Sequence, residues 1–187
     1  MKRTYRFWLI IFVLVAFSLA CNLGSYRSKS LPTIPVSTEA AQSLEETAQA
    51  ALEGAAKSGA VDLVIDEAQV TSLLAFELQK SEQQFISDPQ VYLRDGQMQV
   101  FGKVKSETIA AEGMVVIEPR VDAAGRANFK VVSAKVGPIP LPSDIVTEVE
   151  ASLNQVFNQQ LEALAPNIFI DSLVIADGLM TIKGHAR

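Results

Sequence analysis

Residues 89–105 decide the fold, and they read PQVYLRDGQMQVFGKVK. Two runs with alternating side chains flank Asp95-Gly96, a dipeptide typical of a two-residue hairpin turn. In the second run Met98, Val100 and Val104 fall on one face, and the other face is mostly polar. The segment therefore predicts an antiparallel hairpin with one apolar face.

The flanking sequence extends this hairpin into an α+β fold. Alternation and turn residues predict further strands at residues 61–65, 108–121, 126–136, 167–176 and 179–185, the last two joined by Asp177-Gly178. Helical spacing predicts helices over residues 38–57, 68–79 and 145–164. Short connections require antiparallel pairing. We therefore expect an antiparallel sheet, a four-strand meander plus a C-terminal hairpin, covered by a long amphipathic helix.

The first twenty residues have the pattern of an export signal. Three basic residues precede an apolar run over residues 7–20, which is too short for a bilayer span of about 20 residues. The run ends in FSLAC, which resembles a bacterial lipobox, although Ser18 stands where leucine is usual. The resemblance implies a diacylglyceryl group on Cys21 and cleavage after Ala20. An incidental cysteine in an ordinary secretory signal and an uncleaved short anchor are the alternatives, but Cys21 is the only cysteine.

Charge limits the partners of the mature chain. Because the signal carries three basic residues and no acidic one, its removal would change the net charge from −5 to −8. An acidic chain lacks the basic patch typical of nucleic-acid binding and of attraction to anionic headgroups. We therefore expect no nucleic-acid partner and a membrane contact made through the lipid anchor, on the extracytoplasmic face of a cell membrane. The sequence does not indicate which membrane or which protein partner.

The expected organisation is a signal (1–20), a lipidated tether (21–37), an Ala-rich helix (38–60) and an α+β domain (61–187). The tether is rich in serine and proline and has no periodicity. The Ala-rich helix has a narrow apolar stripe of Leu44, Ala48, Leu52 and Ala55. Such a stripe buries little surface, so this helix either forms a stalk or packs lightly on the domain, and we favour light packing.

From residue 61 onward the chain resembles the YpmS-like and LmeA-like exported proteins, and more distantly the YceB-like lipoproteins. Three features carry the resemblance: the strand and helix VDLVIDEAQVTSLLAFEL, the meander around PQVYLRDGQMQVFGKV and GMVVIEPRVDAAGRANFKV, and the loop and helix start SAKVGPIPLPSDIV. It covers about 125 residues. It implies a fold of the tubular lipid-binding (TULIP/SMP) type, in which a long helix beside a curved sheet leaves an apolar groove for acyl chains.

If the resemblance holds, the groove has candidates on the strands and on the long helix, namely Met98, Val100, Val104, Met114, Val116, Phe129, Val131, Val149, Leu153, Val156 and Phe157. The alternative is that these side chains fill an ordinary core. The apolar loop GPIPLP at residues 137–142 also allows two interpretations. Ile139 and Leu141 either form a membrane-facing tip or pack beneath a rigid connector.

The sequence offers little for catalysis. His185 is the only histidine and lies two residues from the end, and no phosphate-binding, nucleophile-elbow or calcium-loop motif occurs. We therefore expect no enzyme activity, no metal and no cofactor. The main functional hypothesis is a membrane-anchored protein that binds or carries an apolar ligand such as a phospholipid or polyprenyl lipid. A non-catalytic envelope scaffold with a solid core is the main alternative, and an unrecognised hydrolase is a weaker one.

Overall fold

The computed structural model describes residues 31–80, 86–105, 110–164 and 167–186. The chain forms two compact units, Met1–Thr33 and Ile34–Arg187, and the description below concerns the second. The predicted signal and Cys21 lie outside the described residues. No helix among the described segments has the length and apolar character needed to cross a bilayer.

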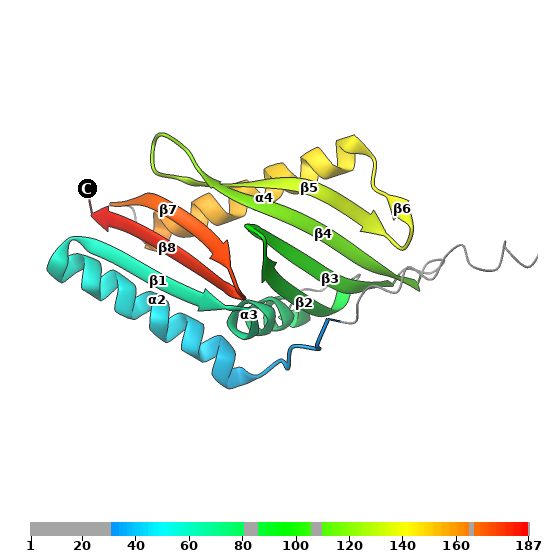
Figure 1. The fold of residues 1–187 in the computed structure, drawn as a ribbon, viewed down its shortest axis with the longest axis horizontal. Coiled ribbons are helices and arrows are strands. Elements are labelled where there is room, and N and C mark those ends of the chain that lie inside the picture. Colours follow the sequence, from blue (N-terminus) through cyan, green and yellow to red (C-terminus); the bar gives the residue numbers. More distant parts are fainter. Residues whose placement is uncertain (1–30, 81–85, 106–109, 165–166, 187) are drawn as a thin grey trace, which may run out of the picture. The chain divides into compact units, whose positions relative to one another are not determined.

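The second unit has an α+β fold, as predicted (Figure 1). Its elements in chain order are α2 (Thr38–Ser58), β1 (Ala60–Asp66), α3 (Glu67–Lys80), β2 (Ile86–Arg94), β3 (Gln97–Lys105), β4 (Ala110–Val121), β5 (Ala127–Val136), β6 (Ile139–Pro140), α4 (Ser143–Leu164), β7 (Ile168–Ala176) and β8 (Leu179–Ala186). Strands β2 to β6 form an antiparallel sheet in sequential order, and a second sheet has the order β1-β8-β7.

Both Asp-Gly pairs form the predicted hairpin turns. Asp95 and Gly96 have φ angles of 53° and 75°, and Asp177 and Gly178 have 52° and 82°. Two consecutive positive φ angles define a type I′ turn, whose twist matches that of the flanking strands. These turns fix the registers of β2 with β3 and of β7 with β8.

Two strand pairings differ from the predicted meander and hairpin. Residues 137–142 do not form only a loop, because Ile139 and Pro140 pair with Val136 and Lys135 as the short strand β6. A proline is tolerated there because β6 is an edge strand whose outer side needs no donor. In addition, β1 pairs with β8, about 120 residues away along the chain. No local pattern encodes a pairing of that separation.

The Ala-rich helix α2 packs on the domain through part of the predicted stripe: Leu44 and Ala55 are buried, whereas Ala48 and Leu52 are only partly buried. Its buried residues are Ala41, Leu44 and Ala55, and it contacts α3 and β1. The packing begins before the helix: the Ile34 N–H donates to the Gln90 side chain over 2.7 Å, and the Gln90 amide donates to the Ile34 carbonyl over 3.2 Å. Residues 34–37 of the predicted tether therefore belong to this unit.

Helix α3 lies along the outer edge of β2 and binds its backbone. The N–H of Leu93 donates to Glu67 Oε1 over 2.7 Å, and the N–H of Val91 donates to Thr71 Oγ1 over 3.0 Å. Glu67 also forms an ion pair with Arg94. The spacing of the two acceptors on α3 matches that of the two donors on β2. Four helical residues rise about 6 Å, and two strand residues rise about 6.6 Å.

Helix α4 makes the same arrangement at the opposite edge of the sheet. The N–H of Val131 donates to Glu150 Oε2 over 2.9 Å, and the N–H of Phe129 donates to Asn154 Oδ1 over 2.7 Å. The Asn154 amide in turn donates to the Phe129 carbonyl over 2.8 Å. Two helices thus satisfy the exposed edges of β2 and β5, which would otherwise present unpaired backbone groups.

These hydrogen bonds determine where the two helices lie. Backbone N–H groups of a strand point along the plane of its sheet, so their acceptors must lie beyond the edge rather than over the face. Glu67 and Thr71 therefore hold α3 beside β2, and Glu150 and Asn154 hold α4 beside β5. None of the described helices crosses the middle of the sheet face between α3 and α4.

Replacing Asn154 by leucine should lower the free energy of unfolding by about 1–3 kcal/mol, because the buried backbone of Phe129 loses its partner. Urea titration followed by circular dichroism measures the change. The matched control is Gln155→Leu at the next, exposed position of the same helix, expected to change stability by about 0.5 kcal/mol or less. Equal effects of the two substitutions would contradict the edge-binding role.

Candidate apolar groove

The register of the strands gathers apolar side chains on one face of the five-stranded sheet. Val100 lies opposite Val91 on one neighbour and Val115 on the other, and Met98 pairs with Leu93. Residues paired in this way point to the same side. The larger apolar residues on this face include Ile86, Val91, Leu93, Met98, Val100, Val104, Val115, Ile117, Val121, Phe129 and Val131, together with the small residues Ala127 and Ala134.

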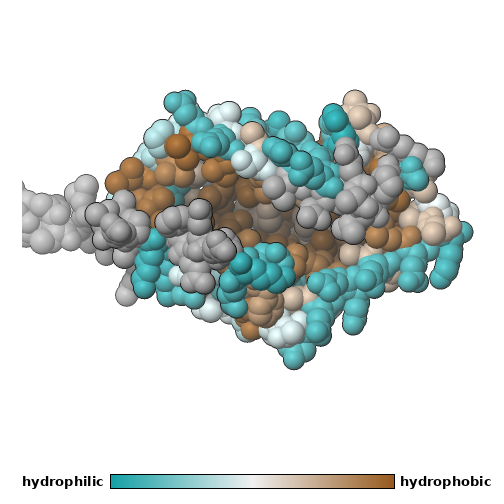
Figure 2. Space-filling model, turned by 180° about the vertical axis from the view of Figure 1, so that it is seen from behind, coloured by the Kyte–Doolittle hydropathy of each residue, from teal (hydrophilic) through white to brown (hydrophobic). Residues whose placement is uncertain are grey.

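Burial along this face is high beside the two helices and at Ile117 on β4, and it is lower along the inner strand β3. Val91 and Leu93, next to α3, are 0% exposed, and Phe129 and Val131, next to α4, are also buried. By contrast, no residue of the inner strand β3 is buried. A helix lying over a sheet would bury the inner strands most, so this pattern indicates an open trough. Figure 2 shows hydrophobic surface gathered in a hollow in the middle of the face seen from behind.

Apolar side chains of the two helices form the walls of this groove. On the α3 side, Val70 and Leu74 pack against the cluster of Val91 and Leu93. On the α4 side, Leu153 and Phe157 pack against the cluster that contains Phe129 and Val131. The Phe157 ring meets the Phe129 ring edge-on, with centroids 4.6 Å apart and planes at 70°. Each wall therefore presents hydrocarbon to the trough.

The two ends of the groove differ. At one end, side chains of β7 and β8, including Leu173, pack against both clusters. The N–H of Ile170 donates to the Gly125 carbonyl over 3.0 Å and holds β7 in place. At the other end, Ile86 and Ile139 are exposed. Within the described part of the chain, the second sheet closes one end of the groove, and no described segment covers the end where β2 and β4 begin.

The structure brings together most of the predicted groove residues. Floor and walls include Met98, Val100, Val104, Phe129, Val131, Leu153 and Phe157. Val149 lies on the same helix but is 40% exposed. Leu141 packs partly buried against the α4-side cluster, whereas Ile139 is 67% exposed, so the two apolar loop residues behave differently. The side chain of Val156 lies outside the described residues.

Met114 and Val116 are on the wrong face for the predicted groove. Met114 pairs with Phe101 and Val116 with Gln99, so both point away from Met98 and Val100. The run Met114 to Ile117 is apolar at every position, and alternation cannot choose a face in such a run. The register instead puts their neighbours Val115 and Ile117 in the groove.

The α3 wall, formed by Val70 and Leu74, is not among the groove residues predicted from the sequence. Val70 and Leu74 are four residues apart and so share one helix face, which was a detectable signal. Their closeness to Met98 and Val100 follows from the pairing of α3 with the β2 edge, which depends on Glu67 and Thr71. These two residues look like ordinary polar positions of an amphipathic helix.

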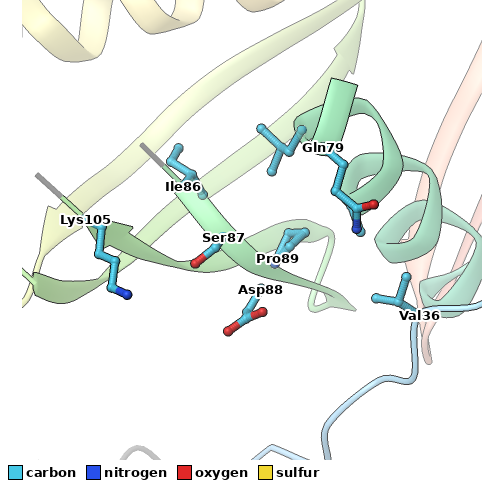
Figure 3. Close-up of a pocket in the computed structure, with 9 residues that line it drawn as sticks. Val36, Gln79, Ile86, Ser87, Asp88, Pro89 and Lys105 are labelled. Carbon is cyan, nitrogen blue, oxygen red and sulfur yellow. The ribbon is translucent and has the colours of Figure 1, made fainter. Parts of the chain in front are cut away.

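A separate pocket of about 440 Å³ lies at the open end, between the end of α3 and the start of β2. Figure 3 shows Ile86 and Pro89 on β2, Gln79 on α3 and Val36 before α2 around it. Near it, Lys103 forms an ion pair with Asp88 at 2.7 Å. The hydrogen bond from Lys103 lowers the pKa of the Asp88 carboxyl, and the same bond raises the pKa of Lys103.

The polar side chains form no metal-binding cluster within the described part of the chain. His185 contacts the Asp171 carboxylate at 3.0 Å and stacks on Phe169, with both members of the ion pair about half exposed. No group of three His, Cys, Asp or Glu side chains in the described residues has a metal-binding arrangement. The side chains that form the floor and walls of the candidate groove are mainly apolar.

Comparison with known proteins gives no assignment. No protein-family model, curated protein or solved structure matches the chain. The function is therefore inferred from the residues and geometry of this chain alone.

Proposed function

We propose that this chain is a membrane-anchored envelope lipoprotein that binds the hydrocarbon part of a lipid in the groove between α3 and α4. The observation that carries the proposal is the incomplete burial of β3, whose apolar side chains lie between two well-packed sheet edges. Exposed apolar surface of this kind is rare in a soluble domain unless something covers it. A scaffold with a solid core would bury the inner strand instead.

The charges and dimensions of the groove support a lipid tail as the ligand. Two carboxylates on the helices that form its walls, Glu67 and Glu150, accept hydrogen bonds from backbone N–H groups at the sheet edges. The floor from Met98 to Val104 spans about 20 Å at roughly 3.3 Å per residue. An acyl chain that fills half of a hydrocarbon core about 30 Å thick fits this length. A polar headgroup would then remain outside at the open end.

Extraction of the purified full chain tests the proposal directly. We expect organic solvent to release a phospholipid or polyprenyl lipid at about one molecule per chain beyond the anchor itself, because a groove of this area gains free energy by burying hydrocarbon. Mass spectrometry of the extract identifies and counts the lipid. Absence of lipid, together with no binding of fluorescent acyl probes, would favour the scaffold instead.

The proposed anchor has its own test. Replacing Cys21 by alanine should move nearly all of the protein from the membrane fraction to the soluble fraction, because two or three acyl chains give lasting attachment and the mature chain is acidic. Cell fractionation and immunoblotting measure the distribution. Circular dichroism of the released protein checks that the fold persists, and Ser25→Ala in the same segment serves as the control. Retention of the Cys21 variant on membranes would refute lipid anchoring.

A further inference from the structure

Exposed apolar side chains gather at the open end of the groove. Five residues, which we call the rim, are 40–67% exposed: Val36, Ile86, Ile139, Ile145 and Val149. They come from four segments, namely the residues before α2, the start of β2, strand β6 and the first two turns of α4. A single exposed apolar residue is ordinary, but a set gathered from separate segments marks an interaction surface.

The strand register places these segments at the same end of the sheet. Ile86 pairs with Val104, and Val104 pairs with Ala111 on the next strand. Glu112 follows Ala111 on β4, and its carbonyl accepts a hydrogen bond from the N–H of Gly137 over 2.7 Å. Gly137 lies two residues before Ile139. Val36 and Ile86 line the same pocket (Figure 3). The rim therefore follows the edge of the sheet from β2 to α4.

The path of the chain favours a membrane as the occupant of this surface. Residues 22–33 connect Cys21 to Ile34, and Ile34 is fixed to Gln90 on the strand that begins with Ile86. A segment of this length spans at most about 40 Å even when fully extended. An anchor on Cys21 would thus hold the bilayer surface within reach of the rim. The same end is where a lipid would leave the groove.

The polar groups around the rim are compatible with this contact. Lys105 at the end of β3 and Lys135 in the β5–β6 hairpin have no ion pair within the described residues, so both can meet lipid phosphates. Acidic side chains lie near the rim as well: Asp144 and Glu148 on α4, Glu112 on β4, and Asp88, which is paired with Lys103. At the tip, Pro138 and Pro140 have no N–H group, so insertion of Ile139 leaves few donors without partners.

We propose that the rim inserts into the surface of a phospholipid bilayer and so joins the groove to the membrane. This inference rests on the proposed function for the position of the anchor. It predicts a fixed orientation of the domain, with the β6 tip toward the lipid and the three-stranded sheet away from it. A phospholipid bilayer is the single partner that the tether, the lysines and the position of the groove all favour.

A tryptophan reporter tests this orientation. The one tryptophan of the sequence, Trp8, lies in the signal that cleavage after Ala20 would remove, so Ile139→Trp gives the lipid-anchored protein a single reporter. The full chain is reconstituted into phosphatidylcholine vesicles with brominated acyl chains, which quench tryptophan on contact. Val174→Trp is the control, because Val174 is 56% exposed on the outer face of the second sheet. We expect several-fold stronger quenching at 139 than at 174.

A second reporter tests whether quenching at residue 139 reflects only a local change in the β5–β6 hairpin. Ile86→Trp lies on another segment of the rim and should be quenched like Ile139→Trp. Equal quenching at 139, 86 and 174, or none at any of them, would overturn the inference. Lipid extraction separates the two proposals: quenching at the rim without extractable lipid would leave the membrane contact and refute the groove. Extractable lipid without quenching at the rim would support the groove and refute the membrane contact.

Discussion

Replacing Val100 by glutamate is expected to reduce lipid binding by roughly tenfold or more. Val100 lies in the middle of the groove floor, between Val91 and Val115, and is only partly buried, so the substitution leaves the packed edges of the sheet in place. A carboxylate facing hydrocarbon without a partner costs well over the about 1.4 kcal/mol that a tenfold loss represents. Titration with a fluorescent acyl probe measures the affinity, and extraction measures the retained lipid.

The control for this prediction lies on the adjacent residue. Gln99→Glu adds the same charge to the same strand, but Gln99 points to the opposite face, together with Val116. We expect it to bind lipid like the natural chain. A second variant, Val100→Phe, narrows the groove without adding charge and should also weaken binding. Unchanged binding in both Val100 variants, with the fold intact, would show that the ligand does not lie on β3.

Replacing Leu93 by alanine should lower the free energy of unfolding by about 2–5 kcal/mol. Leu93 is 0% exposed and packs with Val91 and Ile175, where α3, the edge of the large sheet and the second sheet meet. Deleting its side chain removes buried methyl groups and leaves a cavity that the bound edge of β2 cannot readily close. Chemical denaturation measures the change in the urea midpoint at constant slope.

Leu179→Ala provides the matched control for the core. It is the same chemical change on a strand of the second sheet, but Leu179 is 43% exposed. We expect a loss of about 0.5 kcal/mol or less. If Leu93→Ala destabilised the protein no more than Leu179→Ala does, the junction of α3 with the two sheets would not be a core. The α3 wall of the groove would then not be supported by packing around Leu93.

The local elements were predictable because their causes are local. The type I′ turns at Asp95-Gly96 and Asp177-Gly178 need two positive φ angles, and aspartate and glycine tolerate them. Helix α3 begins with a reciprocal pair, in which the Gln69 N–H donates to the Asp66 side chain and the Asp66 N–H donates to the Gln69 side chain. Such signals lie within a few residues of the structure that they determine.

The groove was only partly predictable for the opposite reason. Alternation placed Met98, Val100 and Val104 together, but the fully apolar run around Met114 and Val116 carries no information about its face. The polar residues that position the walls have their partners 19 to 27 residues away along the chain. Their side-chain types fit a solvent-facing helix surface equally well.

The sequence by itself determined the α+β class, the two tight hairpins and the apolar stripes of the helices. These follow from backbone preferences and from side-chain periodicity within one element. Only the tertiary structure decided that α3 and α4 lie beside the sheet instead of across it, and that β1 completes the second sheet. The reason is that edge N–H groups must find acceptors in the plane of the sheet. Glu67, Thr71, Glu150 and Asn154 meet that requirement only once distant segments are folded together.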